Sequence, residues 1–316
     1  YVDAPGNPAI DLKAEILRIK KEKGAVIMAH YYQPAEIQDI ADYIGDSLAL
    51  AQIAAKLDNA RMIVLCGVHF MGETAKVLCP DKKVLIPDIN AGCSLADSCP
   101  ADKFAEFVAA HPDHTVISYV NTSIGVKALT DVLVTSGNAR KIVDTFPADA
   151  KLIFGPDRNL GNYINSVTGR NMLLWDGACH VHEEFSVEKI AELKKQHPQA
   201  KVLVHPECKR PLQLMADVIG STAVLLKYAV ESDDTEFIVA TESGILHQMQ
   251  KSCPDKTFIP APPNDSTCGC NDCRYMKLNT MEKLYNCLKF EQPEIIVDPE
   301  LAEKARRPIE RMLELS

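Results

Sequence analysis

Short apolar segments rich in β-branched residues alternate along the chain with segments in which apolar residues recur every three to four positions. The first kind is typical of buried strands in a parallel sheet, and the second kind is typical of amphipathic helices. Helical periodicity is clear over residues 37–57, 186–195 and 281–315. This alternation of strand and helix predicts an α/β fold.

The predicted strands recur with a nearly constant offset, which indicates an internal repeat. Three first strands lead to His30, Tyr119 and His205, which are 89 and 86 residues apart. The second segments close at residues 45–47, 134–136 and 220–222, with the same offsets. Third segments follow at residues 62–65, 152–154 and 237–239, and fourth ones at 84–86, 172–174 and 258–259. The chain is therefore predicted to be a triplication.

Each copy is expected to form a three-layer αβα sandwich around a small parallel sheet. We expect the three homologous domains to span residues 13–99, 100–185 and 186–275, followed by a helical segment, 276–316, that packs back on the body. Ligands bind beyond the carboxyl ends of parallel strands. Three such ends around a pseudo-three-fold axis would form one central active site.

The composition and net charge of the chain argue against some classes of binding partner. The chain has 316 residues, of which 47% are hydrophobic and 24% charged, and a formal net charge of −9. An acidic chain is a poor match for nucleic acid or an anionic membrane surface. No apolar run approaches the ~20 residues that cross a bilayer, and the first ten residues do not resemble a signal peptide. The sequence thus predicts a cytoplasmic protein that acts on small molecules.

Eleven cysteines in a chain of this size argue against a disulfide scaffold and for metal binding, catalysis or packing. Cys93 and Cys179 follow equivalent fourth strands, 86 residues apart, and the same offset leads to the cluster that contains Cys268, Cys270 and Cys273. Three thiolates from three repeats could hold zinc, copper or an iron-sulfur centre. A cubane held by three cysteines leaves one iron open to act as a Lewis acid.

Other cysteine roles remain open at this point. The 268–273 cluster could instead be a local zinc site or a redox-sensitive pair. Buried packing is the expectation for the remaining six cysteines, because free cysteine is among the most buried residue types. These are Cys66, Cys79, Cys99, Cys208, Cys253 and Cys287.

Polar residues occupy matched positions after the first and second strands of each repeat. Histidine, tyrosine and glutamate are candidate proton carriers, and asparagine is a candidate hydrogen-bonding anchor. Hydroxyls that precede helices could serve as N-caps or could help to bind an anion at the helix N-terminus. The candidates are His30, Tyr32, Tyr119, Asn121, His205 and Glu207 after first strands, and Ser47, Ser136, Ser221 and Thr222 after second strands.

Five motifs together resemble the quinolinate synthase family, and they run in order along nearly the whole chain. They are AHYYQP at 29–34, IGDSL at 44–48, YVN at 119–121, VTSGN at 134–138 and HPEC at 205–208. The resemblance implies three αβα domains with pseudo-three-fold symmetry and one oxygen-sensitive 4Fe–4S cluster on three cysteines. The ligands map onto Cys93, Cys179 and Cys273, the last because the family's third ligand precedes a Met-containing turn, here 276–280.

The resemblance also implies a reaction and residue roles. The family condenses iminoaspartate with dihydroxyacetone phosphate, releasing phosphate and two waters, to give quinolinate for NAD synthesis, and an aspartate-oxidising enzyme would supply the imine. Tyr32, Glu207 and His205 are the expected catalytic residues. The expected substrate-binding residues are His30, Ser47, Tyr119, Asn121, Ser136, His205, Glu207, Ser221 and Thr222. His182 is a further candidate near the cluster.

Two alternatives stay open on the sequence alone. One is an iron-sulfur hydro-lyase that acts on another small acid, and the other is a zinc-stabilised or redox-sensing binding protein. The sequence has neither G-x-G-x-x-G after its first strand nor a G-x-x-x-x-G-K-[ST] motif. Dinucleotide-dependent and P-loop functions are therefore not predicted.

Overall fold

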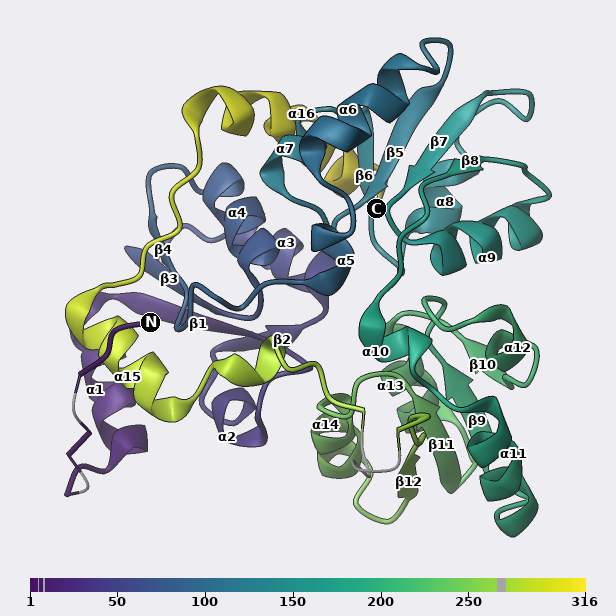
Figure 1. Cartoon of the computed structure of the whole chain (residues 1–316). Coiled ribbons are helices and arrows are strands. Elements are labelled where there is room, and N and C mark those ends of the chain that lie inside the picture. Colours follow the sequence, from purple (N-terminus) through teal and green to yellow (C-terminus); the bar gives the residue numbers. More distant parts are fainter. Residues whose placement is uncertain (5, 8, 266–270) are drawn as a thin grey trace.

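The computed structural model describes residues 1–316 except residues 5, 8 and 266–270. This part of the chain forms three four-stranded sheets whose strands all run parallel. The strands have the same spatial order in each sheet. The first strand of the repeat lies between the second and the third, and the fourth strand lies at the edge next to the third. Figure 1 shows the three sheets arranged around a common centre, the first at the left, the second at the upper right and the third at the lower right.

In the first repeat, helices cover both faces of the sheet. Ile27 packs with Ile16 and Leu284 on one face, and Met28 packs with Leu50 and Ala75 on the other. The elements are α1 (Leu12–Lys23), β1 (Ala25–His30), α2 (Ala35–Gln38), β2 (Tyr43–Gly45), α3 (Ser47–Ala55), β3 (Met62–Cys66), α4 (His69–Leu78), β4 (Lys83–Leu85) and α5 (Ser94–Asp97).

The second repeat has the same layers. Val116 packs with Phe104 on one face, and Ile117 packs with Ile142 and Leu160 on the other. The elements are α6 (Ala101–Ala109), β5 (Thr115–Tyr119), α7 (Ile124–Lys127), β6 (Val132–Val134), α8 (Ala139–Val143), β7 (Leu152–Gly155), α9 (Arg158–Thr168), β8 (Leu173–Leu174) and α10 (His180–Glu183).

The third repeat also has apolar packing on both faces of its sheet. Val202 packs with Ile190 and Leu212, and Leu203 packs with Leu225 and Met249. The elements are α11 (Val187–Gln196), β9 (Lys201–Val204), α12 (Arg210–Gln213), β10 (Val218–Ile219), α13 (Thr222–Glu231), β11 (Glu236–Ala240), α14 (Ile245–Ser252) and β12 (Thr257–Pro260). Alternate residues of each first strand thus bury opposite faces, as the pleat of a strand requires.

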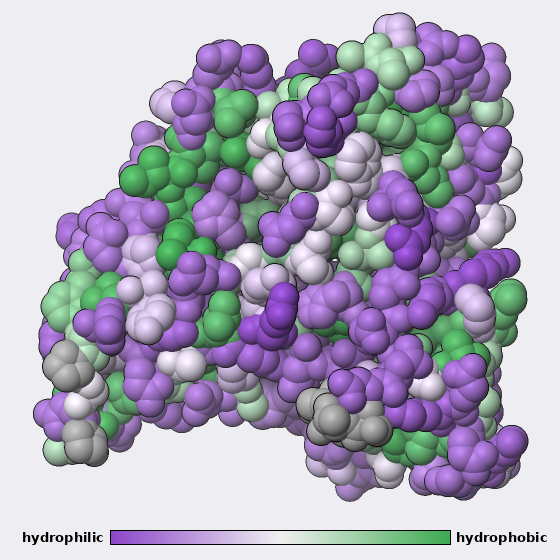
Figure 2. All heavy atoms as spheres, viewed as in Figure 1, coloured by the Kyte–Doolittle hydropathy of each residue, from purple (hydrophilic) through white to green (hydrophobic). Residues whose placement is uncertain are grey.

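The C-terminal segment contains η1 (Met276–Leu278), α15 (Met281–Phe290) and α16 (Pro299–Leu315). Helix α15 lies against α1, and α16 contacts α4, α7, β6 and α8, so it joins the first repeat to the second. Figure 1 shows α15 at the left beside α1 and α16 at the top between the two repeats. None of the described helices is both long and apolar enough to cross a membrane. Figure 2 shows polar side chains over most of the visible face.

The predicted α/β fold of three αβα repeats is confirmed by these sheets and layers. The helix predicted over 186–195 is also confirmed, as α11. The domain limits given above stay a prediction.

Residues 37–57 were expected to be helical, and this prediction was wrong for a continuous helix. Strand β2 interrupts the segment and pairs with β1. A side chain at Gly45 would place a Cβ 2.8 Å from that of Ala49. Asp46 accepts a hydrogen bond from the Ala49 N–H at 3.0 Å, so the helix begins only after this cap.

Candidate functional site

The carboxyl ends of the three sheets face one pocket to which every repeat contributes polar side chains. Among the described residues, the pocket includes every predicted site residue except Ser221, and it also includes His182 and Glu242. The predicted residues that line it are His30, Tyr32, Ser47, Cys93, Tyr119, Asn121, Ser136, Cys179, His205, Glu207, Thr222 and Cys273. The repeat therefore brings together side chains that are up to 243 residues apart in the sequence.

The hydroxyls after the second strands have different positions. Ser221 is the N-cap of α13, and its Oγ accepts from the Val224 N–H at 3.3 Å. In the first repeat Asp46 takes the cap position, so Ser47 is the first residue of α3 and lines the pocket. The cap role that the sequence left open thus applies to Ser221 and not to Ser47.

The turns that carry the polar side chains are held by one equivalent position in each repeat. Gln38 Nε2 donates to the carbonyls of Tyr31 and Gln33 at 2.9 and 2.8 Å, and Gln213 Nε2 makes the same two bonds in the third repeat. In the second repeat this position is Lys127, whose Nζ donates to the carbonyls of Val120, at 2.8 Å, and Thr122. In each repeat, a buried side chain therefore holds the turn in place by hydrogen bonds to its backbone carbonyls.

His30 and His205 have matched environments. In each ring Nδ1 accepts the backbone N–H of the residue two positions later, Tyr32 at 3.1 Å and Glu207 at 3.2 Å. Burial lowers the pKa of both imidazoles to about 3, so both are neutral near pH 7. Because Nδ1 is the acceptor, the proton of each neutral ring lies on Nε2, which can donate to a ligand.

Glu207 lines the pocket and is buried, and two side chains bind its carboxylate. Tyr119 Oη donates to its Oε1, and His182 Nδ1 lies 3.0 Å from its Oε2. Burial opposes ionisation of this carboxyl, but His182, His205 and the two hydrogen bonds outweigh burial and lower its pKa. For Tyr119, burial and the neighbouring Glu207 raise the phenol pKa well above its ordinary value. Glu207 is therefore a carboxylate held by a neutral phenol.

Tyr32 connects to Glu207 through two other side chains. Its hydroxyl lies 2.7 Å from Thr222 Oγ1 and 2.7 Å from Thr241 Oγ1. Thr241 Oγ1 lies 3.0 Å from His182 Nε2, and the other ring nitrogen of His182 reaches Glu207. Burial raises the pKa of Tyr32 well above its ordinary value, so the group is a phenol. A continuous hydrogen-bond chain thus joins the two predicted proton carriers.

Cys93, Cys179 and Cys273 are neighbours, and each is followed by a short helix. Burial raises the pKa of Cys93 to about 12 and that of Cys179 well above its ordinary value, and the thiols raise one another's pKa further. Burial likewise raises the pKa of Cys273. In each case backbone N–H groups of the following turn act in the opposite direction. They belong to Leu95 and Ala96, to His182, and to Tyr275 and Met276.

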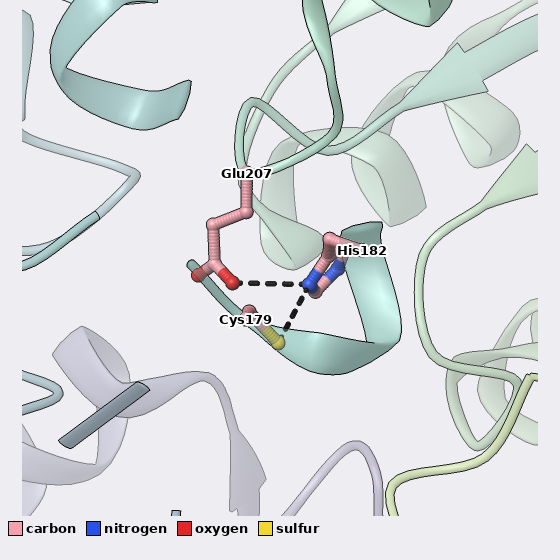
Figure 3. Close-up of side chains that lie close together, drawn as sticks. All are labelled: Cys179, His182 and Glu207. Carbon is pink, nitrogen blue, oxygen red and sulfur yellow. Dashed lines mark hydrogen bonds and ion pairs between the residues drawn. The ribbon is translucent and has the colours of Figure 1, made fainter. Parts of the chain in front are cut away.

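This donor set fits a thiolate-bound metal or cluster. Three partly buried thiols, each with at least one backbone N–H donor near its sulfur, supply soft ligands whose negative charge is partly compensated. Cys179, His182 and Glu207 form a second donor group, because their ligand atoms all lie within 4.8 Å of one another. Figure 3 shows His182 Nδ1 between the sulfur of Cys179, 3.2 Å away, and the Glu207 carboxylate.

The remaining cysteines match the packing prediction as far as the structure describes them. Cys66, Cys79, Cys99, Cys208, Cys253 and Cys287 are all free and buried. Cys268 and Cys270 lie outside the described residues, so the local zinc or redox site that includes them is not addressed by the structure.

The sequence analysis missed Thr241, Asp157 and Glu242. All three follow the third strand of a repeat. Strand pairing places Asp157 and Glu242 at equivalent positions, which are 85 residues apart, one residue fewer than the offset between Cys93 and Cys179. The approximate offset was the available signal. Their partners could not be inferred from it, because an offset identifies equivalent backbone positions and not the side chains that they meet.

The fold and the pocket define the class of protein. Three α/β repeats converge on one buried pocket that holds a carboxylate, phenols, neutral imidazoles and thiols, which is the arrangement of an enzyme active site.

Comparison with known proteins identifies the family. Residues 14–314 match the family described as Quinolinate synthetase A protein (NadA). The chain is 57% identical to the quinolinate synthase of Synechococcus sp. (strain ATCC 27144 / PCC 6301 / SAUG 1402/1), over 97% of this chain and 95% of that protein. It is 57% identical to that of Thermosynechococcus vestitus, over 99% and 98%, and 55% identical to that of Chloroherpeton thalassium, over 97% and 95%. The chain belongs to the quinolinate synthase family and is an enzyme of that kind.

Proposed function

We propose that this chain condenses iminoaspartate with dihydroxyacetone phosphate to form quinolinate for NAD biosynthesis, releasing phosphate and two waters. One observation carries the proposal beyond family membership. Cys93, Cys179 and Cys273, each from a different sheet, line the same pocket as Tyr32 and Glu207. A reaction that combines condensation with loss of water needs proton carriers beside a group that activates oxygen, and this pocket has residues for both tasks.

The three cysteines would hold a single 4Fe–4S cluster. When bound, the cluster supplies a Lewis-acidic iron that has no protein ligand. The N–H groups of the short turns after each cysteine stabilise negative charge on the sulfurs, which supports this assignment.

Substrate anions would be bound by local donors, because the protein as a whole carries a net charge of −9. The neutral imidazoles of His30 and His205 offer Nε2–H groups, and Ser47 and Thr222, the first residues of α3 and α13, line the same pocket. Ser136 lines the same pocket. Together these groups suit a ligand that carries carboxylates and a phosphate.

Asn121 would bind a donor group of the substrate. Its side-chain oxygen is buried, and no group in the described part of the chain donates a hydrogen bond to it. A buried amide oxygen without a donor is costly, so a ligand N–H or O–H that reaches it gains binding energy. The imine nitrogen of iminoaspartate and the hydroxyl of dihydroxyacetone phosphate both meet this requirement.

Tyr32 and Glu207 would move protons during isomerisation and dehydration. Tyr32 is a phenol and Glu207 a carboxylate, so one can give a proton where the other accepts one. The hydrogen bonds through Thr241 and His182 connect them, so a proton that Glu207 has accepted from the substrate could be returned to Tyr32 after Tyr32 Oη has given one up. An aspartate-oxidising enzyme in the same compartment, proposed to be the cytoplasm, would supply the imine.

Two measurements test the proposal. Protein prepared without oxygen should contain about four iron atoms and four acid-labile sulfides per chain, as a cubane requires. It should form quinolinate only when both substrates are present. Zinc without sulfide would reject the cluster, and dehydration of simple hydroxy acids without dihydroxyacetone phosphate would favour the hydro-lyase alternative. Cys93→Ala is the matched control, because it removes one proposed ligand and should abolish both iron binding and turnover.

A further inference from the structure

Two buried carboxyl residues occupy the same place in the second and third repeats. Asp157 lies two residues after Gly155, and Glu242 lies two residues after Ala240. Gly155 and Ala240 are the last residues of β7 and β11 and pair with equivalent positions of β5 and β9. The corresponding residue of the first repeat is Val68. Both carboxyl residues have 0% exposure, although a buried carboxyl is costly unless other groups compensate it.

Glu242 is bonded to the backbone of a proposed cluster ligand. Its Oε1 accepts the N–H of Cys273 at 3.0 Å, and its Oε2 accepts the N–H of Gly244 at 2.7 Å. The Lys277 ammonium lies 2.9 Å from Oε1, and Lys277 N–H donates to the Cys273 carbonyl. Glu242 and Lys277 therefore hold the backbone of Cys273 on both sides of the residue.

Asp157 lies against the segment that leads to Cys179. Its Oδ1 accepts the Leu160 N–H at 2.8 Å and caps α9, and its backbone forms a parallel bridge with Gly177, two positions before Cys179, in which the Arg158 N–H donates to the Gly177 carbonyl at 2.8 Å. Burial raises the pKa of Asp157 well above its ordinary value, while the Cys179 N–H is one of the backbone groups that lower it. Its Oδ2 is buried and has no hydrogen-bond partner among the described residues.

We propose that Asp157 and Glu242 are positioning residues that fix the backbones of two of the three cysteines that bind the cluster. This inference rests on the function proposed above. Cys179 and Cys273 follow the edge strands β8 and β12 along the chain. Asp157 links the segment before Cys179 to the end of β7, and Glu242 links Cys273 to the end of β11. The sulfurs consequently keep the separations that one cluster requires.

Four variants and two matched controls test the proposal. Asp157→Ala and Glu242→Ala remove the acceptors, whereas Asp157→Asn and Glu242→Gln keep an acceptor oxygen. Asp131→Ala and Asp217→Ala are the controls, because each removes a carboxylate that accepts a strand N–H at 2.8 Å elsewhere in the same repeat. Each protein is reconstituted with iron and sulfide without oxygen. Cluster loss to a chelator, the EPR spectrum of the reduced cluster and the circular dichroism of the apoprotein are then measured.

We expect the two alanine variants to lose the cluster at least about tenfold faster than wild type, the size of effect seen when outer hydrogen bonds of metal ligands are removed. Their EPR spectra should also change. Asp157→Asn and both controls should behave like wild type, whereas Glu242→Gln, which keeps one of the two acceptor oxygens, should lie between wild type and Glu242→Ala. The proposal is overturned if the alanine variants match the controls, or if the Asn and Gln variants lose the cluster as fast as the alanine variants. Where Glu242→Ala does not fold, a Glu242→Gln variant that loses the cluster no faster than its control overturns the proposal. Wild-type protein that takes up no sulfide would instead reject the proposed function, and this inference with it.

Discussion

Replacing Lys127 tests how the turn that carries Asn121 is held in place. Lys127 has 0% exposure, and its Nζ donates to the carbonyls of Val120 and Thr122, while Gln38 occupies the equivalent position in the first repeat. We expect Lys127→Gln to keep the two bonds and to fold normally. Lys127→Met fills the same space without a donor, so it should leave the buried Thr122 carbonyl without a partner, while the Val120 carbonyl keeps the hydrogen bond from the Thr122 N–H.

The expected magnitudes follow from two costs. An unsatisfied buried polar group costs about 1–3 kcal/mol, so Lys127→Met, which leaves one such carbonyl, should be less stable than Lys127→Gln by about that amount. Burial lowers the pKa of the Lys127 ammonium from 10.5 to about 8. That difference corresponds to about 3 kcal/mol by which the buried charge destabilises wild type.

The effect of pH on stability depends on whether the folded or the unfolded chain binds the Lys127 proton more tightly. The unfolded chain keeps the Lys127 proton up to its ordinary pKa, and the folded chain releases it above about 8. The destabilisation is therefore fully present below pH 8 and disappears as the pH rises to about 10.5. Lys127→Gln has no buried ammonium and therefore no such destabilisation. Its stability advantage over wild type at pH 7 should shrink as the pH rises from about 8 to about 10.5.

Urea unfolding of the cluster-free proteins, followed by far-ultraviolet circular dichroism at pH 7 and pH 10, measures these differences. Lys127→Gln serves as the control for loss of the ammonium, because its amide can make the bonds seen in the other two repeats. Equal stability of the Gln and Met variants would refute the role of the two carbonyl bonds. A difference between wild type and Lys127→Gln that does not depend on pH would refute the buried charge as its cause.

Three further predictions concern the pocket itself. Tyr32→Phe should retain iron and sulfide but lower kcat by about 10²–10⁴-fold, the usual contribution of a general acid, and near-normal turnover would remove its proton-transfer role. Thr241→Val removes two neutral hydrogen bonds worth about 1 kcal/mol each, so kcat should fall about tenfold to thirtyfold with no loss of iron; an unchanged rate would break the proposed link between Tyr32 and Glu207. Cys273→Ser should lose the cluster whereas Cys268→Ser should keep it, as judged by iron and sulfide content, and the reverse result would show that the ligand assignment is wrong.

The repeat made the fold and most of the pocket predictable from the sequence. Buried parallel strands are continuous apolar segments, so their offsets of 89 and 86 residues could be recognised, and the polar residues that follow them had to meet. The three-residue strand β2 was harder to find, because a segment this short has too few positions to interrupt the helical periodicity of its flanks. Its limits depend on Gly45 and on the Asp46 cap, which are local packing effects.

The hydrogen-bond partners in the pocket were not predictable, because they cross between repeats. Thr241 follows β11 of the third sheet and bonds to Tyr32 of the first repeat and to His182 of the second. Residue spacing within one repeat contains no information on such contacts. The N-cap falls at the same position in the first and third repeats, Asp46 and Ser221, but two adjacent polar residues could each have taken it, so the sequence did not show which of them caps the helix.

Equivalent positions of the three repeats hold different side chains, and this difference makes one active site possible. The position two residues after His30, Tyr119 and His205 is Tyr32 in the first repeat, Asn121 in the second and Glu207 in the third. The backbone frame is thus repeated, while the proton donor, the amide anchor and the carboxylate each occur once. Tyr32 is bonded by two threonines of the third repeat, and Glu207 by Tyr119 and His182 of the second. Because each acid–base group is held by a repeat other than its own, a separate repeat would keep its sheet and lose the environment that sets its chemistry.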